Sequence, residues 1–404
     1  MNNYSDVWTP PDLRPAGAHD PSRIISSWGS FAWDTNRAEL WIYGGGHANY
    51  SGNDVYRWRA STRMWERASL PSQWMKDVLG NYIAVDGADA APVSAHTYDN
   101  NIFLPIVDRL LVLGGAGYNS GGPYRRQTTA TTSRTTGPYF FDPNRADPSK
   151  VGGTTGSHVQ TAGYYPEVVG GEMWQNRDHT INLSGAPLPA NHVDGCTAYA
   201  AEEGRDAVHV AAYVGGTARN LYRYVVADAS NPTMDTWERI GGYRGLRGST
   251  SCAFDSAQRI FFRTGGDARF YYWDTATPGA NNYEVLVDLM DPAAELLPLL
   301  KQNSITLKRC GLDFNPVLRN YLLWCGDGRV WAITPPPTPS PSGWAVSLEP
   351  APTGSSLVPD GKDFGSGILG KWKYVSNLGV FVGLGNKFSG DVWYTSQGLG
   401  TRIA

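Results

Sequence analysis

The feature that most constrains the fold of this chain is a hairpin pattern that recurs six times along its 404 residues. Each copy has an apolar run, a short polar turn, a second apolar run and then a cluster of glycines, as in FAWDTNRAELWIYGGG. The copies span 31–46, 102–115, 197–216, 252–266, 312–326 and 374–385. Because self-similarity along a chain is typical of repeat architectures, each copy predicts one unit of a repeated β structure.

A third apolar run, rich in aromatic residues, follows every hairpin. These runs read DVYRW, GPYFFD, NLYRYVV, RFYYWD, RVWAIT and DVWYTS. In four copies a further segment contains a tryptophan (Trp65, Trp174, Trp237 or Trp344), and in the fourth copy YEVLVDL takes this place. The pattern predicts four strands per unit. We expect the aromatic side chains to pack between neighbouring units.

Four strands per unit, with glycines after the second and a tryptophan in the fourth, resemble the kelch repeat of β-propellers. The resemblance covers nearly the whole chain and implies an all-β fold, a single kelch-like propeller of the galactose-oxidase type with six four-stranded blades. A seventh blade within 116–190 stays open, although no second hairpin with its glycines is recognisable there. The tyrosine–cysteine pair of the galactose oxidase copper site has no counterpart that the sequence marks.

The repeat also gives the boundaries of the predicted blades within the single domain 1–404. We expect a lead-in over 1–27 and blades over 28–71, 95–185, 192–240, 247–289, 308–348 and 370–404. The last copy ends after its third strand, and Trp8 lies unassigned ahead of the first hairpin. We therefore predict that residues 5–10, with Val7 and Trp8, supply the fourth strand of the last blade and close the ring, which removes an exposed sheet edge. A short helix is expected within 290–305.

Composition favours short strands and turns over helices, with 47 glycines, 15 tryptophans and only 18% charged residues. A net charge of −3 gives no electrostatic footprint for nucleic acid. No apolar stretch reaches the roughly 18 residues of a membrane-spanning helix, so we expect no membrane insertion. The start lacks the basic and apolar regions of a signal peptide, which predicts cytoplasmic synthesis.

Four cysteines are too few for a disulfide scaffold and lack the paired spacing of a zinc site. We expect neither a metal nor a cofactor. Cys196, Cys252 and Cys310 fall at like positions on successive first strands, where small residues would fill the inner ring. Cys310 and Cys325 face each other if their hairpin turns at 316–319. A cross-strand disulfide is one interpretation of this pair, whereas cytoplasmic synthesis favours free thiols.

Polar residues gather in two sets of loops that a kelch-like propeller places on one face: those after second strands and those leading into first strands. In GGGHANYSGNDVY, the glycines are explained by backbone geometry, and His47 and His96 by hydrogen bonds within turns. The alternative is that they bind a ligand. The other five copies lack a histidine after the glycines, which makes His47 the foremost candidate. Trp28, Lys371 and Lys373 also precede first strands. The candidate ligand-binding residues are His47, Asn49, Tyr50, Asn53, His96, Tyr118, Arg125, His192, Asp194, Arg247 and Arg309.

A binding module without catalysis is the first function that fits this pattern. A rim with tyrosine, asparagine and arginine suits saccharide recognition. The stretches GGGHANYSGNDVY, SAHTY and RCGLDFNPVLRNYLLWCG resemble a kelch-like group found in bacterial genomes and in tailed-phage structural modules. This resemblance implies a phage tail or tail-fibre component, in the virion after cytoplasmic synthesis. Its partners would be a cell-surface polysaccharide or glycan and other tail proteins, and not nucleic acid.

A polysaccharide lyase is the alternative from a different class. β-Elimination at a uronic acid needs a group that neutralises the carboxylate, a base and an acid. The candidate catalytic residues are His47, His96, Tyr50 and Arg309. Some ulvan lyases are propellers of similar appearance, but their catalytic spacing does not map onto this chain. A third alternative is a protein-interaction scaffold that binds a partner through its rim loops.

Overall fold

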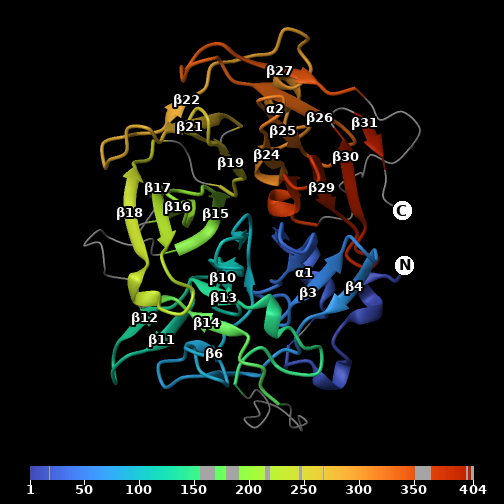
Figure 1. The fold of residues 1–404 in the computed structure, drawn as a ribbon, viewed down its shortest axis with the longest axis vertical. Helices are drawn as coiled ribbons and strands as arrows, with labels where there is room; N and C mark the ends of the chain where they lie inside the picture. Colours follow the sequence, from blue (N-terminus) through green and yellow to red (C-terminus); the bar gives the residue numbers. More distant parts are fainter. Residues whose placement is uncertain are drawn as a thin grey trace.

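The structure, a computed structural model, contains six antiparallel sheets arranged around a common axis as the blades of a β-propeller (Figure 1). It describes residues 1–17, 19–154, 169–178, 191–213, 219–244, 248–266, 268–350, 365–396 and 399–401. The predicted all-β fold and the six blades are confirmed, and these residues hold no seventh four-stranded sheet. None of the helices that the structure describes has the length and apolar character to cross a lipid bilayer.

Within each blade the strands pair in sequence order, from the strand at the axis outward. Blade 1 contains β1 (Phe31–Asp34), β2 (Glu39–Ile42), β3 (Tyr56–Arg59) and β4 (Met64–Arg67). Blade 2 contains β8 (Asn101–Leu104), β9 (Arg109–Val112), β13 (Tyr139–Phe141) and β14 (Trp174–Asn176). Blade 3 contains β15 (Asn191–Tyr199), β16 (Asp206–Tyr213), β17 (Arg219–Val226) and β18 (Thr236–Gly241).

The second half of the ring repeats this arrangement. Blade 4 contains β19 (Cys252–Asp255), β20 (Ile260–Thr264), β21 (Phe270–Asp274) and β22 (Val285–Leu286). Blade 5 contains β24 (Gly311–Asn315), β25 (Asn320–Trp324), β26 (Val330–Thr334) and β27 (Trp344–Leu348). Blade 6 contains β28 (Trp372–Val375), β29 (Val380–Leu384), β30 (Val392–Ser396) and β31 (Leu399–Thr401).

Other elements decorate the blades. The two α-helices are α1 (Ser22–Ser26) and α2 (Leu297–Lys301), the latter inside the segment predicted to be helical. Three two-stranded ribbons join β5 (Trp74–Lys76) with β6 (Tyr82–Ala84), β7 (Ala95–His96) with β10 (Ala116–Gly117), and β11 (Arg125–Gln127) with β12 (Ser133–Thr135). The 3₁₀-helices are Tyr4–Val7 (η1), Pro11–Leu13, Pro143–Arg145, Pro232–Met234, Leu307–Arg309 (η6) and Leu369–Lys371.

The expected fourth strand of blade 4 is divided between two blades. Residues 285–286 pair with β21, whereas β23 (Leu289–Met290) pairs in parallel with β27 on the outer edge of blade 5. This segment therefore ties the two blades together. The sequence does not indicate the crossing, because both pieces lie in the one short segment VLVDLM.

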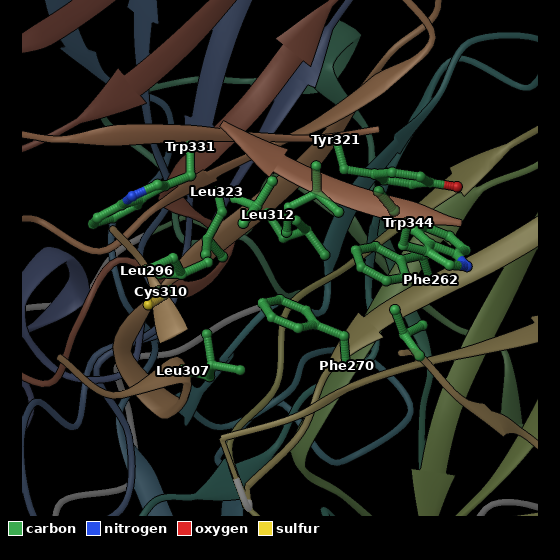
Figure 2. Packing of buried hydrophobic residues seen from close by; sticks show 14 of the residues in the cluster. Phe262, Phe270, Leu296, Leu307, Cys310, Leu312, Tyr321, Leu323, Trp331 and Trp344 are labelled. Carbon is green, nitrogen blue, oxygen red and sulfur yellow. The ribbon is translucent and has the colours of Figure 1, made fainter. Parts of the chain in front are cut away.

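The apolar core is divided into wedges between blades, and Figure 2 shows one between blades 4 and 5. Phe262 of β20 stacks on Trp344 of β27, with ring centroids 4.8 Å apart. Tyr321 of β25 packs against the same phenylalanine at 4.5 Å. Offset stacking of this kind adds about 0.5–1.5 kcal/mol per pair to the burial of the rings. The aromatic residues of the repeat thus hold adjacent blades together, as the pattern predicted.

The ring is closed differently from the prediction. Tyr4–Val7 forms the 3₁₀-helix η1, and β31 supplies the fourth strand of blade 6, so the predicted closing strand over 5–10 is wrong. The N–H groups of Tyr4 and Ser5 donate to the carbonyls of Ser389 and Phe388, in the loop between β29 and β30. Pro10, the last residue of the predicted strand, and Pro11 after it lack the N–H groups that a paired strand needs.

One pair of cysteines is bonded, which corrects the expectation of free thiols. Cys310 and Cys325 form a disulfide one step beyond the register pair Gly311 and Trp324. The hairpin turns at 316–319, as predicted, and this register places the two side chains opposite each other. Cys196 and Cys252 are free and buried.

Candidate functional site at the mouth of the propeller

Three loops that lead into first strands share an unusual backbone conformation. Trp28, Tyr98 and Leu369 each lie three residues before a first strand and have φ values of 47°, 51° and 50°. The N–H of Tyr98 donates to the carbonyl of Trp28 at 2.6 Å, and the N–H of Gly370 donates to the carbonyl of Tyr98 at 3.2 Å. A left-handed backbone costs a bulky residue of order 1–3 kcal/mol. The interlinked loops therefore concentrate strain at one face of the propeller. We call the face that carries Trp28, Tyr98 and Leu369 the mouth.

Side chains from two of these loops pack together with β10 at the mouth. Tyr98, Ala116 and Leu369 form a small apolar cluster. Next to Tyr98, the fully buried Asp99 accepts the N–H of Cys252 at 3.2 Å and forms an ion pair with Lys373. Burial alone lowers the pKa of Lys373, but the carboxylates of Asp99 and Asp313 raise it above its ordinary value. These contacts join blades 2, 4, 5 and 6 across the axis.

The two lysines considered for the rim point inward instead. Lys373 is paired with Asp99, and the Lys371 ammonium nitrogen donates to the carbonyl of Gly29 at 3.1 Å. Burial lowers the pKa of Lys371 to about 7. Both side chains therefore belong to the structure of the axis and not to the rim.

The histidines singled out by the sequence come together at the mouth. The rings of His47 and His96 are in edge contact, with centroids 5.7 Å apart. The indole of Trp28 stacks on His96 at 4.8 Å, and the amide nitrogen of Asn49 lies 3.0 Å from Nε2 of His96. Burial, and then the proximity of His47, lower the pKa of His96 to about 3. His96 is therefore neutral at physiological pH, and its Nε2 accepts the Asn49 amide.

His47 is exposed and is held by the loop that follows β10. Its backbone has φ of 47°, its N–H donates to the carbonyl of Ala116 at 3.1 Å, and its carbonyl accepts the N–H of Asn119 at 2.8 Å. A Cβ at Gly121 would come within 2.7 Å of the imidazole. The glycine at position 121 therefore permits the close approach that fixes the histidine.

Three candidate residues of the first two blades are buried away from the mouth. Tyr50 donates to Asp54 at 3.1 Å, and burial raises its pKa well above the ordinary value. Asn53 donates to the carbonyl of Pro92 at 2.8 Å, and Tyr118 packs against the ring of Trp74 at 5.5 Å. These side chains stabilise the loops that support His47. Sequence proximity to His47 did not reveal that the loop turns inward after Asn49.

The remaining candidates are spread around the mouth and the adjoining loops. Arg125 is exposed on β11, and His192 is buried, which lowers its pKa to about 4. Asp194 accepts the hydroxyl of Ser249 at 2.7 Å. Arg309 is exposed at the end of η6, and its carbonyl accepts the N–H of Ile368 at 2.7 Å. Arg247 lies outside the described residues.

Trp28 is the mouth residue whose importance the sequence analysis missed, although its place before a first strand was noted. Its side chain is 37% exposed, and its N–H donates to the hydroxyl of Ser366. Its positive φ is a tertiary property that no residue pattern marks. Among the described residues, no group of three or more histidine, cysteine, aspartate or glutamate side chains could hold a metal ion.

Comparison with protein-family models and with curated proteins finds no match for this chain. Similar solved structures include a chain of the mitotic checkpoint complex, with 9% identity, a TM-score of 0.38 and 96% of each chain covered. Another is the β-propeller domain of Myceliophteria thermophila Cps50 (Swd1), with 10% identity, a TM-score of 0.36, and 96% of this chain and 87% of that chain covered. The six sheets alone establish the propeller fold, and the kelch resemblance stays a prediction.

Proposed function

We propose that this protein is a saccharide-binding β-propeller without catalytic activity, and that Trp28 is the platform on which a sugar ring stacks. One observation carries the proposal: Trp28 keeps an exposed indole on a left-handed backbone, with the neutral ring of His96 behind it. Both the exposure and the strain cost free energy. Backbone strain of this kind clusters at active sites and ligand-binding loops.

The neighbours of Trp28 supply the polar groups that sugar recognition needs. Saccharide sites combine an apolar face with a few fixed hydrogen-bonding groups. His47 is exposed beside the stack, and Asn49 is half-buried and oriented by His96. The segment 366–368 contacts Trp28 at one end and Arg309 at the other, so it separates the two residues. Arg309 adds a cation to the rim. The rim therefore suits a glycan that carries hydroxyl groups and an acidic substituent.

The same proposal places the protein in a phage tail or tail fibre that recognises a host surface polysaccharide. This part rests on the sequence resemblance to tail modules. We expect an antibody against the chain to label purified virions at the tail in electron micrographs. Labelling of cytoplasmic material alone, with bare virions, would contradict it.

The lyase alternative has less support in the described geometry. The Tyr50 hydroxyl is fully buried against Asp54, and His96 is a weak base because its pKa is about 3. Of the four candidate catalytic residues, His47 and Arg309 are exposed. A substrate at the mouth would therefore lack an accessible tyrosine acid beside its base. We expect no rise in the absorbance of unsaturated uronate products on a panel of uronate polysaccharides.

The test of saccharide binding replaces the platform. Trp28→Ala removes the ring, and we expect at least a tenfold loss of affinity for any glycan that the wild type binds on an array. Trp28→Gly removes the ring and relieves the positive φ, so it should bind equally weakly while folding at least as stably. Tyr283→Ala is the matched control, because Tyr283 is 39% exposed on blade 4, outside the mouth. Glycan binding that survives in both Trp28 variants, or a wild type without array hits, would refute the proposal.

A further inference from the structure

A separate cavity of about 530 Å³ lies on the propeller axis, and residues of all six first strands line it. First strands run from the mouth toward the turns that join them to second strands. Residues of these turns also line the cavity: Thr35, Pro105, Ser256, Pro316 and Ser376. The cavity therefore opens on the face opposite the mouth. We call it the axial cavity.

The wall of the axial cavity carries a ring of aromatic residues. In five of the six blades, the residue before the last of the first strand is aromatic and lines the cavity: Trp33, Phe103, Phe254, Phe314 and Tyr374. Two of them are fixed by contacts with neighbouring blades. The indole N–H of Trp33 donates to Asn377 at 3.0 Å, and Phe254 packs edge-on against His209 at 4.5 Å. The wall is therefore preformed.

The inner end of the axial cavity carries a carboxylate that has no cation bound to it. Asp313 lines the cavity, and its two oxygens accept the backbone N–H groups of Phe314 and Tyr374, each at 2.8 Å. Among the described residues, no lysine, arginine or histidine nitrogen lies within ion-pair distance of this carboxylate. Lys373, which also lines the cavity, makes its ion pair with Asp99.

Asp313 is the carboxylate at this end that lacks an ion-pair partner. Lys373 and Asp99 form an ion pair, whereas Asp313 accepts two backbone N–H groups and attracts Lys373 only at longer range. The ammonium of Lys371 binds the carbonyl of Gly29 and does not line the cavity. A further acceptor is present, because Oδ1 of Asn101, another lining residue, is buried without a hydrogen-bond partner. The polar end of the cavity is thus rich in acceptors.

We propose that the axial cavity binds a small organic cation, in which an ammonium group is carried on a compact apolar body. The cation would pair with Asp313, and the apolar body would lie against the aromatic wall. Aromatic rings attract cations as well as apolar groups, and small-ligand cavities of about 300–1,000 Å³ include this volume. The site is independent of the mouth and of the saccharide proposal.

The test compares a cation with its neutral isostere by titration calorimetry. Choline is the probe, and 3,3-dimethylbutan-1-ol is the uncharged control of the same shape. We expect saturable binding of choline, and at least tenfold weaker binding of the neutral alcohol. Asp313→Asn keeps the shape of the side chain and should lose tenfold or more of the choline affinity. Asp274→Asn, which changes a carboxylate outside the cavity, should bind as the wild type does.

The pH dependence on the wild type keeps the test independent of how well the variant folds. Burial raises the pKa of Asp313 to about 6, although Lys373 and two backbone N–H groups oppose this rise and Asp99 adds to it. Choline affinity should therefore fall several-fold between pH 7.5 and pH 5, and protonation of Lys371, whose pKa is lowered to about 7, acts in the same direction. Absence of choline binding, equal binding of the neutral alcohol, or full affinity in Asp313→Asn would each overturn the proposal.

Discussion

At the residue scale, the mouth depends on a histidine that stays uncharged. His96 is 2% exposed and lies between the rings of Trp28 and His47. Protonation would place a charge between these two rings, and among the described residues no carboxylate forms an ion pair with His96. The energetic consequence is a contribution of His96 to the pH dependence of folding stability.

We expect His96 to destabilise the fold in acid. Its pKa is about 3 in the folded protein and about 6.5 in an unfolded chain, so the unfolded state binds the extra proton as pH falls through this window. The free energy of unfolding should lose about 3 kcal/mol from this group between pH 7 and pH 4. Urea denaturation at both pH values measures it.

The matched variant for this measurement is His96→Gln, which keeps a polar side chain and cannot titrate in this range. His192 acts in the same direction, because burial lowers its pKa to about 4. Asp313 acts in the opposite direction, because its raised pKa stabilises the folded state as pH falls through 6. The quantity to compare is therefore the free energy of unfolding that the wild type and His96→Gln each lose between pH 7 and pH 4. Equal losses in both proteins would contradict the role assigned to His96.

At the element scale, the hairpin of β24 and β25 is fastened by the bond between Cys310 and Cys325. Its register was predictable, since the turn segment NPVLRN separates two mostly apolar runs of equal length. The bond itself was not predictable, because cytoplasmic synthesis favoured free thiols whereas the hairpin register favoured a disulfide. The bond forms because the register places the two cysteine side chains opposite each other.

Reduction of this disulfide should weaken the fold. The bond closes a loop with a sequence separation of 15, for which chain entropy predicts about 3 kcal/mol. We expect the melting temperature to fall by several degrees when a phosphine reductant is added. A Cys310→Ala/Cys325→Ala variant, already lacking the bond, should not respond to the reductant. Four titratable thiols in the denatured, unreduced protein would show that the bond is absent.

The polar ribbon of β11 and β12 was not predictable from the repeat. Blade hairpins carry alternating apolar residues and terminal glycines, whereas β11 (Arg125–Gln127) and β12 (Ser133–Thr135) are polar throughout. Only tertiary contacts hold these segments as strands. For example, the N–H of Gln127 donates to Asp77 at 2.9 Å. Insertions of this kind lack the hydrophobic periodicity on which strand prediction depends.

At the scale of the whole molecule, η1 fastens the first blade to the last. Figure 1 shows the N-terminal segment beside blade 6. Tyr4 is fully buried, its ring contacts Trp65 of β4 at 5.0 Å, and its hydroxyl donates to the carbonyl of Pro21 at 2.9 Å. Trp8 is half-buried and contacts Tyr4 and Phe388. Side-chain burial therefore replaces the backbone pairing that a closing strand would provide.

This closure predicts an order of effects for two substitutions. Tyr4→Ala should lower the free energy of unfolding by about 3–5 kcal/mol, as expected for loss of a buried aromatic ring. Trp8→Ala should cost less, because part of that ring is already in water. Ser5→Ala is the control, since its hydrogen bond to Phe388 uses the backbone alone. An unchanged stability in Tyr4→Ala would mean that η1 does not close the ring.

The sequence by itself determined the all-β class, the six blades and the aromatic packing between them, because hairpins, turns and strand periodicity are local patterns repeated along the chain. It also pointed to His47 and His96, which the fold brings into contact. Only the tertiary structure decided that Trp28 is exposed on a strained backbone, that Tyr50 is buried, and that Asp313 faces an axial cavity. These properties arise where loops and strands from different blades meet, and such contacts depend on packing between segments far apart in the chain.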